Sequence, residues 1–362
     1  MRIVSTSYSK TDEFTHPQKW LERISFYTGL LEELGKEHEV ISIERINYEG
    51  ELEQNRVHYH FIKLKNKVTR FPFKMHRFIK KMKPDVVFVN GFIFPLQIIQ
   101  LRWKLGKKTR IIVLHRSEKP SKELNKWLQK IADKKVDAYL FSSNEFAKDW
   151  RDIIDEQKMH EVIQASSSFQ PGDKNIARES LSIKGSTVLL WVGRLDQNKD
   201  PLTLIKAFKQ FQQDQPQAVL YIIYQSDELI NECRELIGAN ENIRLVGKVE
   251  HDQLENWYGA ADFFISSSHY EGNGIAALEA MSCGCVPVLS SINSFRRMTG
   301  PGKCGLLFEP GNVSGLLQAL KKANELDREA EKEKVLQQFR EELSFEAVAR
   351  KINRVITIVK NG

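Results

Sequence analysis

Cysteine is scarce in this chain of 362 residues, and its spacing does not suit a metal site. The four cysteines are Cys233, Cys283, Cys285 and Cys304. A structural zinc site needs cysteines or histidines in pairs at short, repeated separations, which this pattern lacks. We expect reduced thiols in a cytosolic protein rather than a disulfide framework.

Long hydrophobic runs are also missing. The most apolar stretch, Phe88 to Ile99, is interrupted by polar residues, glycine and proline, and is too short to span a bilayer. The opening RIVSTSY is typical of a strand and lacks the basic and apolar regions of a secretory signal. We therefore expect a cytoplasmic globular protein, and the length of 362 residues favours two domains.

Acidic residues are few in one block, between Lys63 and Lys135. This block holds 21 Lys and Arg against 4 Asp and Glu, a charge of +17; since the whole chain carries +7, the remainder carries −10. Residues 71–84 and 120–135 predict basic amphipathic helices within it. Each apolar stripe could pack on the domain's own sheet, but for the whole block we predict binding to an anionic membrane surface.

Nucleic acid is the other polyanion that such a block could bind. The chain carries none of the recognised nucleic-acid-binding motifs, so we expect no nucleic-acid partner.

Apolar runs that predict strands, such as Val188–Val192 and Phe263–Ser266, alternate with helical patterns, such as residues 16–35, along the whole chain. This rhythm is typical of doubly wound parallel sheets, and it repeats on both sides of the polar stretch 166–175. We predict an α/β protein with an N-terminal domain over 1–168 and a second domain over 169–342. A terminal helix is predicted over 343–362, because apolar positions fall at helical spacing from Phe345 to Lys360.

The strand-to-helix loop in 187–208, TVLLWVGRLDQNKDPLTLIKAF, places two cations after a buried strand. Gly193, Arg194 and Lys199 occupy this loop, where ligands of open α/β sheets bind. Arginine offers a planar fork to phosphate oxygens, and lysine offers a point charge. The sequence therefore predicts an anion site here, although a solvated surface pair is the simpler alternative.

A second segment, EGNGIAALE over 271–279, places two carboxylates around a turn that opens a helix. Gly272, Asn273, Gly274 and Ile275 form the turn, whose unpaired backbone N–H groups favour an anion. Carboxylates repel a phosphate, so they must bind a different part of the ligand. We predict that Glu271 and Glu279 accept hydrogen bonds from sugar or ribose hydroxyls.

Together these segments resemble the family-4 glycosyltransferases, enzymes of GT-B architecture. The matching stretches are 191–208, 243–290 and 305–320, in the family's order and spacing, whereas the first half matches only in its element pattern. The resemblance implies two Rossmann-like domains that face each other across a cleft, with the terminal helix packed on the first. It also implies a retaining hexosyltransferase that uses a nucleotide-sugar donor.

The resemblance also assigns roles in the donor site. Arg194, Lys199 and the backbone of 272–275 would neutralise the leaving phosphate, Glu271 would hold the donor sugar, and Glu279 the ribose. The base would lie against Val249. Because cations serve the phosphate and the chain has no Asp-x-Asp pair, we expect neither a metal nor another cofactor.

On the acceptor side, His115 follows a strand where the family has its active-site histidine. Arg116 could meet an acceptor phosphate. The first loop carries Ser7 and Lys10 where family members commonly carry glycines. We expect a glycan or lipid-linked acceptor at the inner membrane face; the open alternatives are a catalytically silent subunit and a nucleotide-sugar epimerase or hydrolase.

Overall fold

The computed structural model describes residues 1–63, 70–115 and 118–361. The chain divides into two compact units. Unit 1 comprises residues 1–166 together with the chain from Phe345 onward, and unit 2 comprises Ser167–Ser344. The join lies two residues before the predicted boundary at 168.

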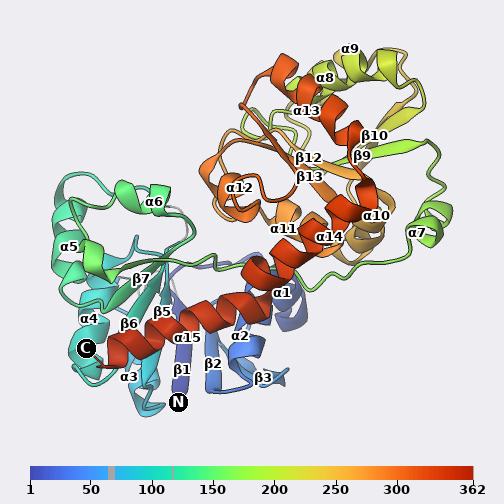
Figure 1. Ribbon diagram of the computed structural model, residues 1–362. Coiled ribbons are helices and arrows are strands. Elements are labelled where there is room, and N and C mark those ends of the chain that lie inside the picture. Colours follow the sequence, from blue (N-terminus) through green and yellow to red (C-terminus); the bar gives the residue numbers. More distant parts are fainter. Residues whose placement is uncertain (64–69, 116–117, 362) are drawn as a thin grey trace. The chain divides into compact units, whose positions relative to one another are not determined.

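Unit 1 is built on a sheet of eight strands, in the order β3-β4-β2-β1-β5-β6-β7-β8 (Figure 1). Every neighbouring pair is parallel except β3 with β4. The strands are β1 (Arg2–Ser7), β2 (Glu39–Glu44), β3 (Gly50–Gln54), β4 (Val57–Phe61), β5 (Val86–Asn90), β6 (Arg110–Leu114), β7 (Ala138–Phe141) and β8 (Met159–Glu161).

Helices cover both faces of this sheet, because its central strands are apolar on both sides. On one face, a hydrophobic core contains Ile3 of β1 and buried residues of α1 (Pro17–Arg23), α2 (Ser25–Leu34) and α15 (Phe345–Asn361). On the other face, a second core contains Val4 of β1 and buried residues of α3, α4, α5 and α6. These helices are α3 (Phe73–Lys81), α4 (Pro95–Leu105), α5 (Glu123–Asp133) and α6 (Asn144–Lys148).

The terminal helix α15 packs against α2 within unit 1. A Cβ atom at Gly29 of α2 would lie 2.4 Å from the ring of Phe345, so only glycine allows this approach. The apolar spacing of the last helix, noted in the sequence, provides the buried face.

Two strands of unit 1 have no apolar run from which they could be predicted. The first, β3, alternates half-buried with exposed positions. It pairs with β4 through a tight turn at Asn55 and Arg56, which both have positive φ. The second, β8, is only three residues long. The helix expected over 16–35 is divided at Ile24 into α1 and α2.

Unit 2 contains a second parallel sheet, in the order β11-β10-β9-β12-β13-β14. Its strands are β9 (Thr187–Gly193), β10 (Ala218–Tyr224), β11 (Ile243–Gly247), β12 (Phe263–Ser266), β13 (Val286–Ser290) and β14 (Leu306–Phe308). Its helices are α7 (Lys174–Ser180), α8 (Pro201–Asp214), α9 (Ile230–Ile237), α10 (Leu254–Ala260), α11 (Ile275–Ser282), α12 (Asn293–Met298), α13 (Val313–Glu325) and α14 (Arg328–Gln338).

The order of the strands creates a switch point in each sheet. In unit 2, β9 and β12 are neighbours, but the chain leaves β9 towards β10 and leaves β12 towards β13, in opposite directions. Unit 1 has the same arrangement at β1 and β5. Ligands of open α/β sheets bind at such points, beyond the carboxyl ends of the strands.

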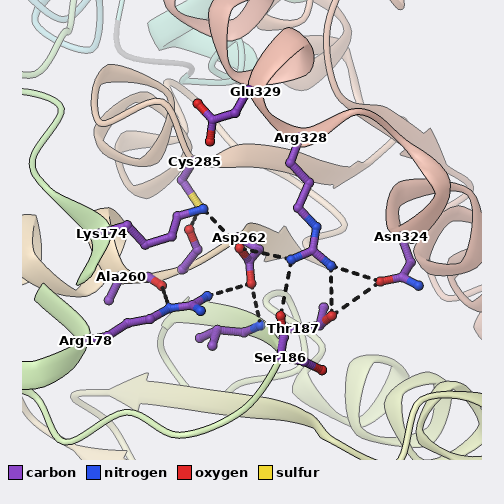
Figure 2. A network of polar contacts seen from close by, with 12 residues as sticks. Lys174, Arg178, Ser186, Thr187, Ala260, Asp262, Cys285, Asn324, Arg328 and Glu329 are labelled. Carbon is purple, nitrogen blue, oxygen red and sulfur yellow. Dashed lines mark hydrogen bonds and ion pairs between the residues drawn. The ribbon is translucent and has the colours of Figure 1, made fainter.

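The opposite end of the unit 2 sheet is held by an ion cluster around Asp262, whose side chain is 2% exposed (Figure 2). Lys174 and Arg328 contact Oδ1 at 3.0 and 3.3 Å, and Arg178 donates to Oδ2 at 2.7 Å. The backbone N–H of Val188 donates to Oδ2 at 2.8 Å. This carboxylate therefore fastens α7 and α14 to the first residues of β9 and β12.

Candidate functional site

The loop between β9 and α8 carries the two predicted cations. Asp196 organises this loop, because Oδ1 accepts the Lys199 backbone N–H at 2.8 Å and Oδ2 lies 3.0 Å from the Arg194 guanidinium. Arg194 is 62% exposed and can turn towards a ligand. Asp200 caps α8 with a left-handed backbone, φ 45°, which is uncommon for a residue with a side chain.

The loop between β12 and α11 carries Glu271, and it meets the first loop directly. Lys199 Nζ forms an ion pair with Glu271 Oε1, and both side chains are largely buried. Ser268 Oγ donates to the same oxygen at 2.9 Å. Glu271 is thus held in one orientation beside the cation that the sequence predicted for the phosphate.

Backbone contacts join the two loops as well. Ser267 Oγ donates to the carbonyls of Lys199 and Asp200, at 2.9 and 2.7 Å. The backbone N–H of His269 donates to the Asn198 carbonyl at 2.8 Å. The loops after β9 and β12 therefore form one structure at the switch point of unit 2.

Helix α11 begins at Ile275, beside these two loops, and Gly274 is its N-cap. Gly274 is left-handed, φ 58°, and a Cβ there would lie 2.7 Å from the Phe295 ring, so the turn requires glycine. Half-buried Gly272 and Asn273 precede it, and Ile275 starts the helix. Asn273 Oδ1 is buried and has no hydrogen-bond partner among the described residues.

Glu279 lies one turn inside α11 and is 5% exposed. Tyr258 of α10 donates to Oε2 at 2.9 Å, and His251 Nε2 lies 2.7 Å from Oε1. Burial, and then the negative charge of Glu279, raises the pKa of Tyr258 well above its ordinary value, so this hydroxyl remains a donor. Glu279 is fixed as a buried acceptor, with half-exposed His251 beside it.

Gly193 is the last residue of β9, adjoining Arg194. Val249 is half-buried after β11, two residues before His251. Thus the residue proposed to meet the base lies in the same loop as the histidine that contacts Glu279.

His115 belongs to unit 1, directly after β6, and is 1% exposed. It stacks on Phe141 and meets the edge of Trp150, with ring centroids 4.4 and 4.9 Å away. Its Nε2 lies 3.4 Å from Glu118 Oε2. Burial lowers the pKa of His115 to about 3, so the imidazole is neutral at physiological pH.

The other predicted residues of unit 1 lie near the first loop or outside the described chain. Ser7 ends β1 and its Oγ accepts the Ser9 backbone N–H at 3.1 Å. Lys10 forms an ion pair with Asp12. Arg116 lies outside the described residues.

The structure thus brings together Arg194, Lys199, Glu271 and the turn that opens α11, with Glu279 one turn further along. The sequence reasoning missed the residues that orient them, which are Asp196, His251, Tyr258 and Ser268. One signal was present: a glutamate within the small apolar helix IAALEAMS had to be buried, and a buried carboxylate needs donors. The identity of those donors was not readable from spacing.

Two cations and the start of a helix offer positive potential at one edge of the sheet, while two oriented carboxylates offer acceptors. This combination suits a ligand that has both phosphates and hydroxyls, as a nucleotide sugar has. The parallel sheets of the two units and this site are those expected of a protein of GT-B architecture, and comparison with known proteins supports this class.

Two family models match the chain over most of its length. The model described as "Glycosyl transferases group 1" matches residues 173–341, and "Glycosyltransferase Family 4" matches residues 27–162. The chain belongs to these family-4, group 1 glycosyltransferases.

Among curated relatives, D-inositol 3-phosphate glycosyltransferase 2 of Catenulispora acidiphila is 31% identical over 42% of this chain and 40% of its own length. The chain thus matches about two fifths of that relative. A Campylobacter jejuni N-acetylgalactosaminyltransferase, named for a diphospho-undecaprenol acceptor, is 26% identical over 72% of this chain and 74% of its own length.

Solved structures agree in fold. A glycosyltransferase from Rickettsia africae superposes with a TM-score of 0.75 at 16% identity, over 100% of this chain and 99% of its own. Sucrose-phosphate synthase from Thermosynechococcus elongatus gives 0.74 at 16% identity, over 99% of both chains. HepE from Anabaena, solved with UDP and glucose, gives 0.71 at 13% identity, over 99% of this chain and 100% of its own.

Proposed function

We propose that this chain is a retaining, metal-independent glycosyltransferase that moves a sugar from a nucleoside-diphosphate sugar to a glycan or lipid-linked acceptor. The observation that carries the proposal is the junction of the loops after β9 and β12. There Lys199 contacts Glu271 while both border the turn that opens α11.

Charge development explains the arrangement. When the bond between the sugar and the phosphate breaks, negative charge builds on the leaving phosphate. Arg194, Lys199 and the backbone N–H groups at 272–275 neutralise it without a divalent ion. Such preorganised charge is commonly the largest catalytic contribution, and loss of one donor costs about 100- to 1,000-fold in rate.

Glu271 and Glu279 bind the uncharged parts of the donor, which are its sugar and its ribose. Both contacts of Glu271 among the described residues use Oε1, so Oε2 can accept a hydroxyl of the donor sugar. Glu279 accepts a ribose hydroxyl. His115 of unit 1, which burial keeps neutral, stays in the proposal as the counterpart of the family's active-site histidine. In the proposed reaction the acceptor oxygen bonds to the anomeric carbon on the face from which the phosphate departs, and the phosphate oxygen takes the hydroxyl proton.

The nature of the acceptor is supported by relatives that work on lipid diphosphates. Besides the Campylobacter enzyme, a Komagataeibacter xylinus mannosyltransferase, named for a cellobiosyl-diphosphopolyprenol acceptor, is 37% identical over 25% of this chain and 22% of its own length. We propose an acceptor of this kind at the cytoplasmic face of the membrane.

A thermal-shift panel of UDP-, GDP- and ADP-sugars, with and without Mg²⁺, tests the donor site. A ligand at a hundred times its dissociation constant adds about 2.7 kcal/mol of stability. We expect one nucleotide class to stabilise the protein equally with and without metal, and the shift to vanish in the Arg194→Ala, Lys199→Ala double variant. Lys206→Ala, an exposed lysine on α8, is the control; a double variant that responds like the parent contradicts the phosphate site.

We also propose that the basic block between Lys63 and Lys135 binds an anionic membrane surface. None of the helices in the described chain is long and apolar enough to cross a bilayer. On α3, Met75 and Ile79 are buried in the core of unit 1, which agrees with the alternative that this apolar stripe packs on the domain's own sheet. Yet Phe73, Trp103 and Trp127, on α3, α4 and α5, are 60%, 75% and 58% exposed among lysines and arginines, which suits an anionic interface.

Sedimentation with phosphatidylcholine vesicles, with and without phosphatidylglycerol, tests this surface. We expect binding only to the anionic vesicles and a loss of binding in the Trp103→Ser, Trp127→Ser variant. Ile176→Ser, which removes a 67% exposed isoleucine from unit 2, is the control. Equal sedimentation with both vesicles removes the membrane from the proposal.

A further inference from the structure

His251 is a contact of Glu279 that can carry a positive charge. It lies in the turn between β11 and α10, and its Nε2 is 2.7 Å from Glu279 Oε1. The contact at the other oxygen, Tyr258, is a neutral hydroxyl. Within the described part of the chain, no lysine or arginine forms an ion pair with Glu279. The charge that balances this buried carboxylate therefore depends on one imidazole.

The neighbouring hydroxyl and thiol keep their protons. Burial, and then the charge of Glu279, raises the pKa of Tyr258 well above its ordinary value. Burial raises the pKa of Cys283, at the end of α11, to about 12. Histidine, in contrast, is the side chain whose charge ordinarily changes between pH 5 and 8. His251 is thus the member of this cluster that can change its charge near neutral pH.

An aromatic ring covers one side of the imidazole. Phe169 is 8% exposed, and its ring centroid lies 5.0 Å from that of His251. The face of an aromatic ring attracts a cation. This packing holds the imidazole against Glu279 and is compatible with its protonated form.

The charged groups around His251 are mostly acidic. Glu255 of α10 accepts the backbone N–H of Gln170, the residue after Phe169, at 2.7 Å. In the turn itself, exposed Glu250 and Asp252 flank His251 on both sides. The one nearby cation of this turn, Lys248, is already paired with Glu250 at 3.0 Å. These surroundings also favour the imidazolium over the neutral ring.

A nucleotide sugar in the proposed donor site would strengthen this preference. Its diphosphate brings negative charge to unit 2, and its ribose would cover Glu279 and His251, of which His251 is 50% exposed in the structure. A carboxylate that loses its water is stabilised by a cation within contact distance. Burial alone would favour a neutral imidazole, but here the imidazolium is covered as one member of an ion pair.

We propose that His251 is a positioning residue that takes up a proton from solvent when the nucleotide sugar binds, and that its imidazolium holds Glu279 towards the ribose. This inference rests on the proposed function and adds a linkage to pH. Because binding favours the protonated form, affinity is complete at low pH and falls as the free protein loses this proton. One proton changes the dissociation constant by at most about tenfold per pH unit.

Isothermal titration of the full chain between pH 6.5 and 8.5 tests the proposal. The probes are UDP-glucose, GDP-mannose and ADP-glucose, whose esterified diphosphates do not titrate in this range. Repeating each titration in buffers of different ionisation enthalpy counts the protons taken up. For a probe that binds, we expect uptake of about 0.3 to 1 proton at pH 7.5 and a dissociation constant that rises about tenfold from pH 6.5 to 8.5.

Three variants separate the charge of His251 from its structural role. His251→Gln keeps an N–H donor for Glu279 but cannot become charged, so it should bind like the parent at pH 8.5, about tenfold more weakly at pH 6.5, and without proton uptake. Glu279→Gln should also abolish the uptake, because the imidazolium loses its carboxylate. His58→Gln is the matched control, since it changes a half-exposed histidine of unit 1 that lies 3.6 Å from Glu53, and it should keep the uptake of the parent.

Each other outcome has a definite meaning. If a probe binds to the parent without proton uptake, the inference is wrong while the proposed donor site stands. The same holds if uptake persists in His251→Gln, or if this variant weakens binding equally at both pH values, as a purely structural role would require. If none of the three probes binds, the proposed function itself fails.

Discussion

The assignment of Glu279 to the ribose leads to a prediction that pairs a protein change with a ligand change. Glu279→Gln removes the negative charge but keeps the size of a side chain that is 5% exposed. Removal of the 2′- or 3′-hydroxyl from the nucleoside diphosphate deletes the proposed partner. If these groups contact each other, either deletion alone weakens binding, and the second deletion then costs little.

The magnitude follows from the geometry of the carboxylate. Tyr258 and His251 already hold its two oxygens, at 2.9 and 2.7 Å, so no ordering is needed when the ribose binds. A hydrogen bond to such a charged group contributes about 1.5–3 kcal/mol, which corresponds to roughly a 10- to 150-fold change in the dissociation constant. We expect the parent to lose this much affinity for one deoxynucleotide.

Isothermal titration with the ribo- and deoxynucleotides measures the effect. In Glu279→Gln the ratio of the two dissociation constants should fall to within about threefold of one, since the charged acceptor is gone. Glu271→Gln is a matched control, because it removes a carboxylate assigned to the sugar and should leave the ratio as in the parent. A Glu279→Gln ratio equal to that of the parent refutes the ribose assignment.

Three further predictions concern stability, pH and metal. Asp262→Asn should lower the free energy of unfolding of unit 2 by about 3 kcal/mol, because the buried cluster loses its only carboxylate among the described contacts. Breaking the exposed ion pair between Asp214 and Lys321 should cost under about 1 kcal/mol. If denaturant titrations give similar losses of unfolding free energy for both changes, the cluster does not have this role. Burial lowers the pKa of His115 from 6.5 to about 3, so the unfolded chain takes up the proton first and unit 1 should lose stability as pH falls below about 6.5. His115→Gln should flatten that loss in denaturant titrations between pH 7.5 and 5, and an unchanged slope would contradict the buried neutral state. Transfer measured in excess EDTA should stay within about twofold of the untreated rate, since in the proposed site Arg194 and Lys199 serve the phosphate. A drop of more than about tenfold that Mg²⁺ restores would overturn the proposed metal independence.

Most of the architecture could be predicted from the sequence, because buried parallel strands are continuous apolar runs. Val188–Val192 and Phe263–Ser266 were predicted in this way, and both lie in the sheet of unit 2. The strands β3 and β8, which have no apolar run, and the break at Ile24 were not predicted. These features depend on turns and packing that local periodicity does not encode.

The candidate site was predictable to the level of its loops. The sequence singled out Arg194, Lys199 and Glu271 because glycine turns and strand ends mark where ligands bind in this fold class; their roles stay predictions. The ion pair between Lys199 and Glu271 was not predicted, since these residues lie 72 positions apart and their contact depends on the order of β9 and β12 in the sheet. Sequence spacing identifies the loops, whereas strand order decides which loops meet.

The contact between Lys199 and Glu271 also explains how two acidic residues could border the proposed phosphate site. Lys199 balances the charge of Glu271, while Tyr258 and His251 supply donors to Glu279, so neither carboxylate presents an unopposed charge to the incoming diphosphate. Arg194 is exposed and pairs through its guanidinium with Asp196, so in the proposed site it would keep the mobility to follow the phosphate as charge develops. The two cations would therefore have different tasks. Partly buried Lys199 orients the carboxylate of Glu271, and exposed Arg194 is able to move. It follows that Lys199→Met should disturb the position of the donor sugar as well as the phosphate, whereas Arg194→Ala should affect the phosphate alone.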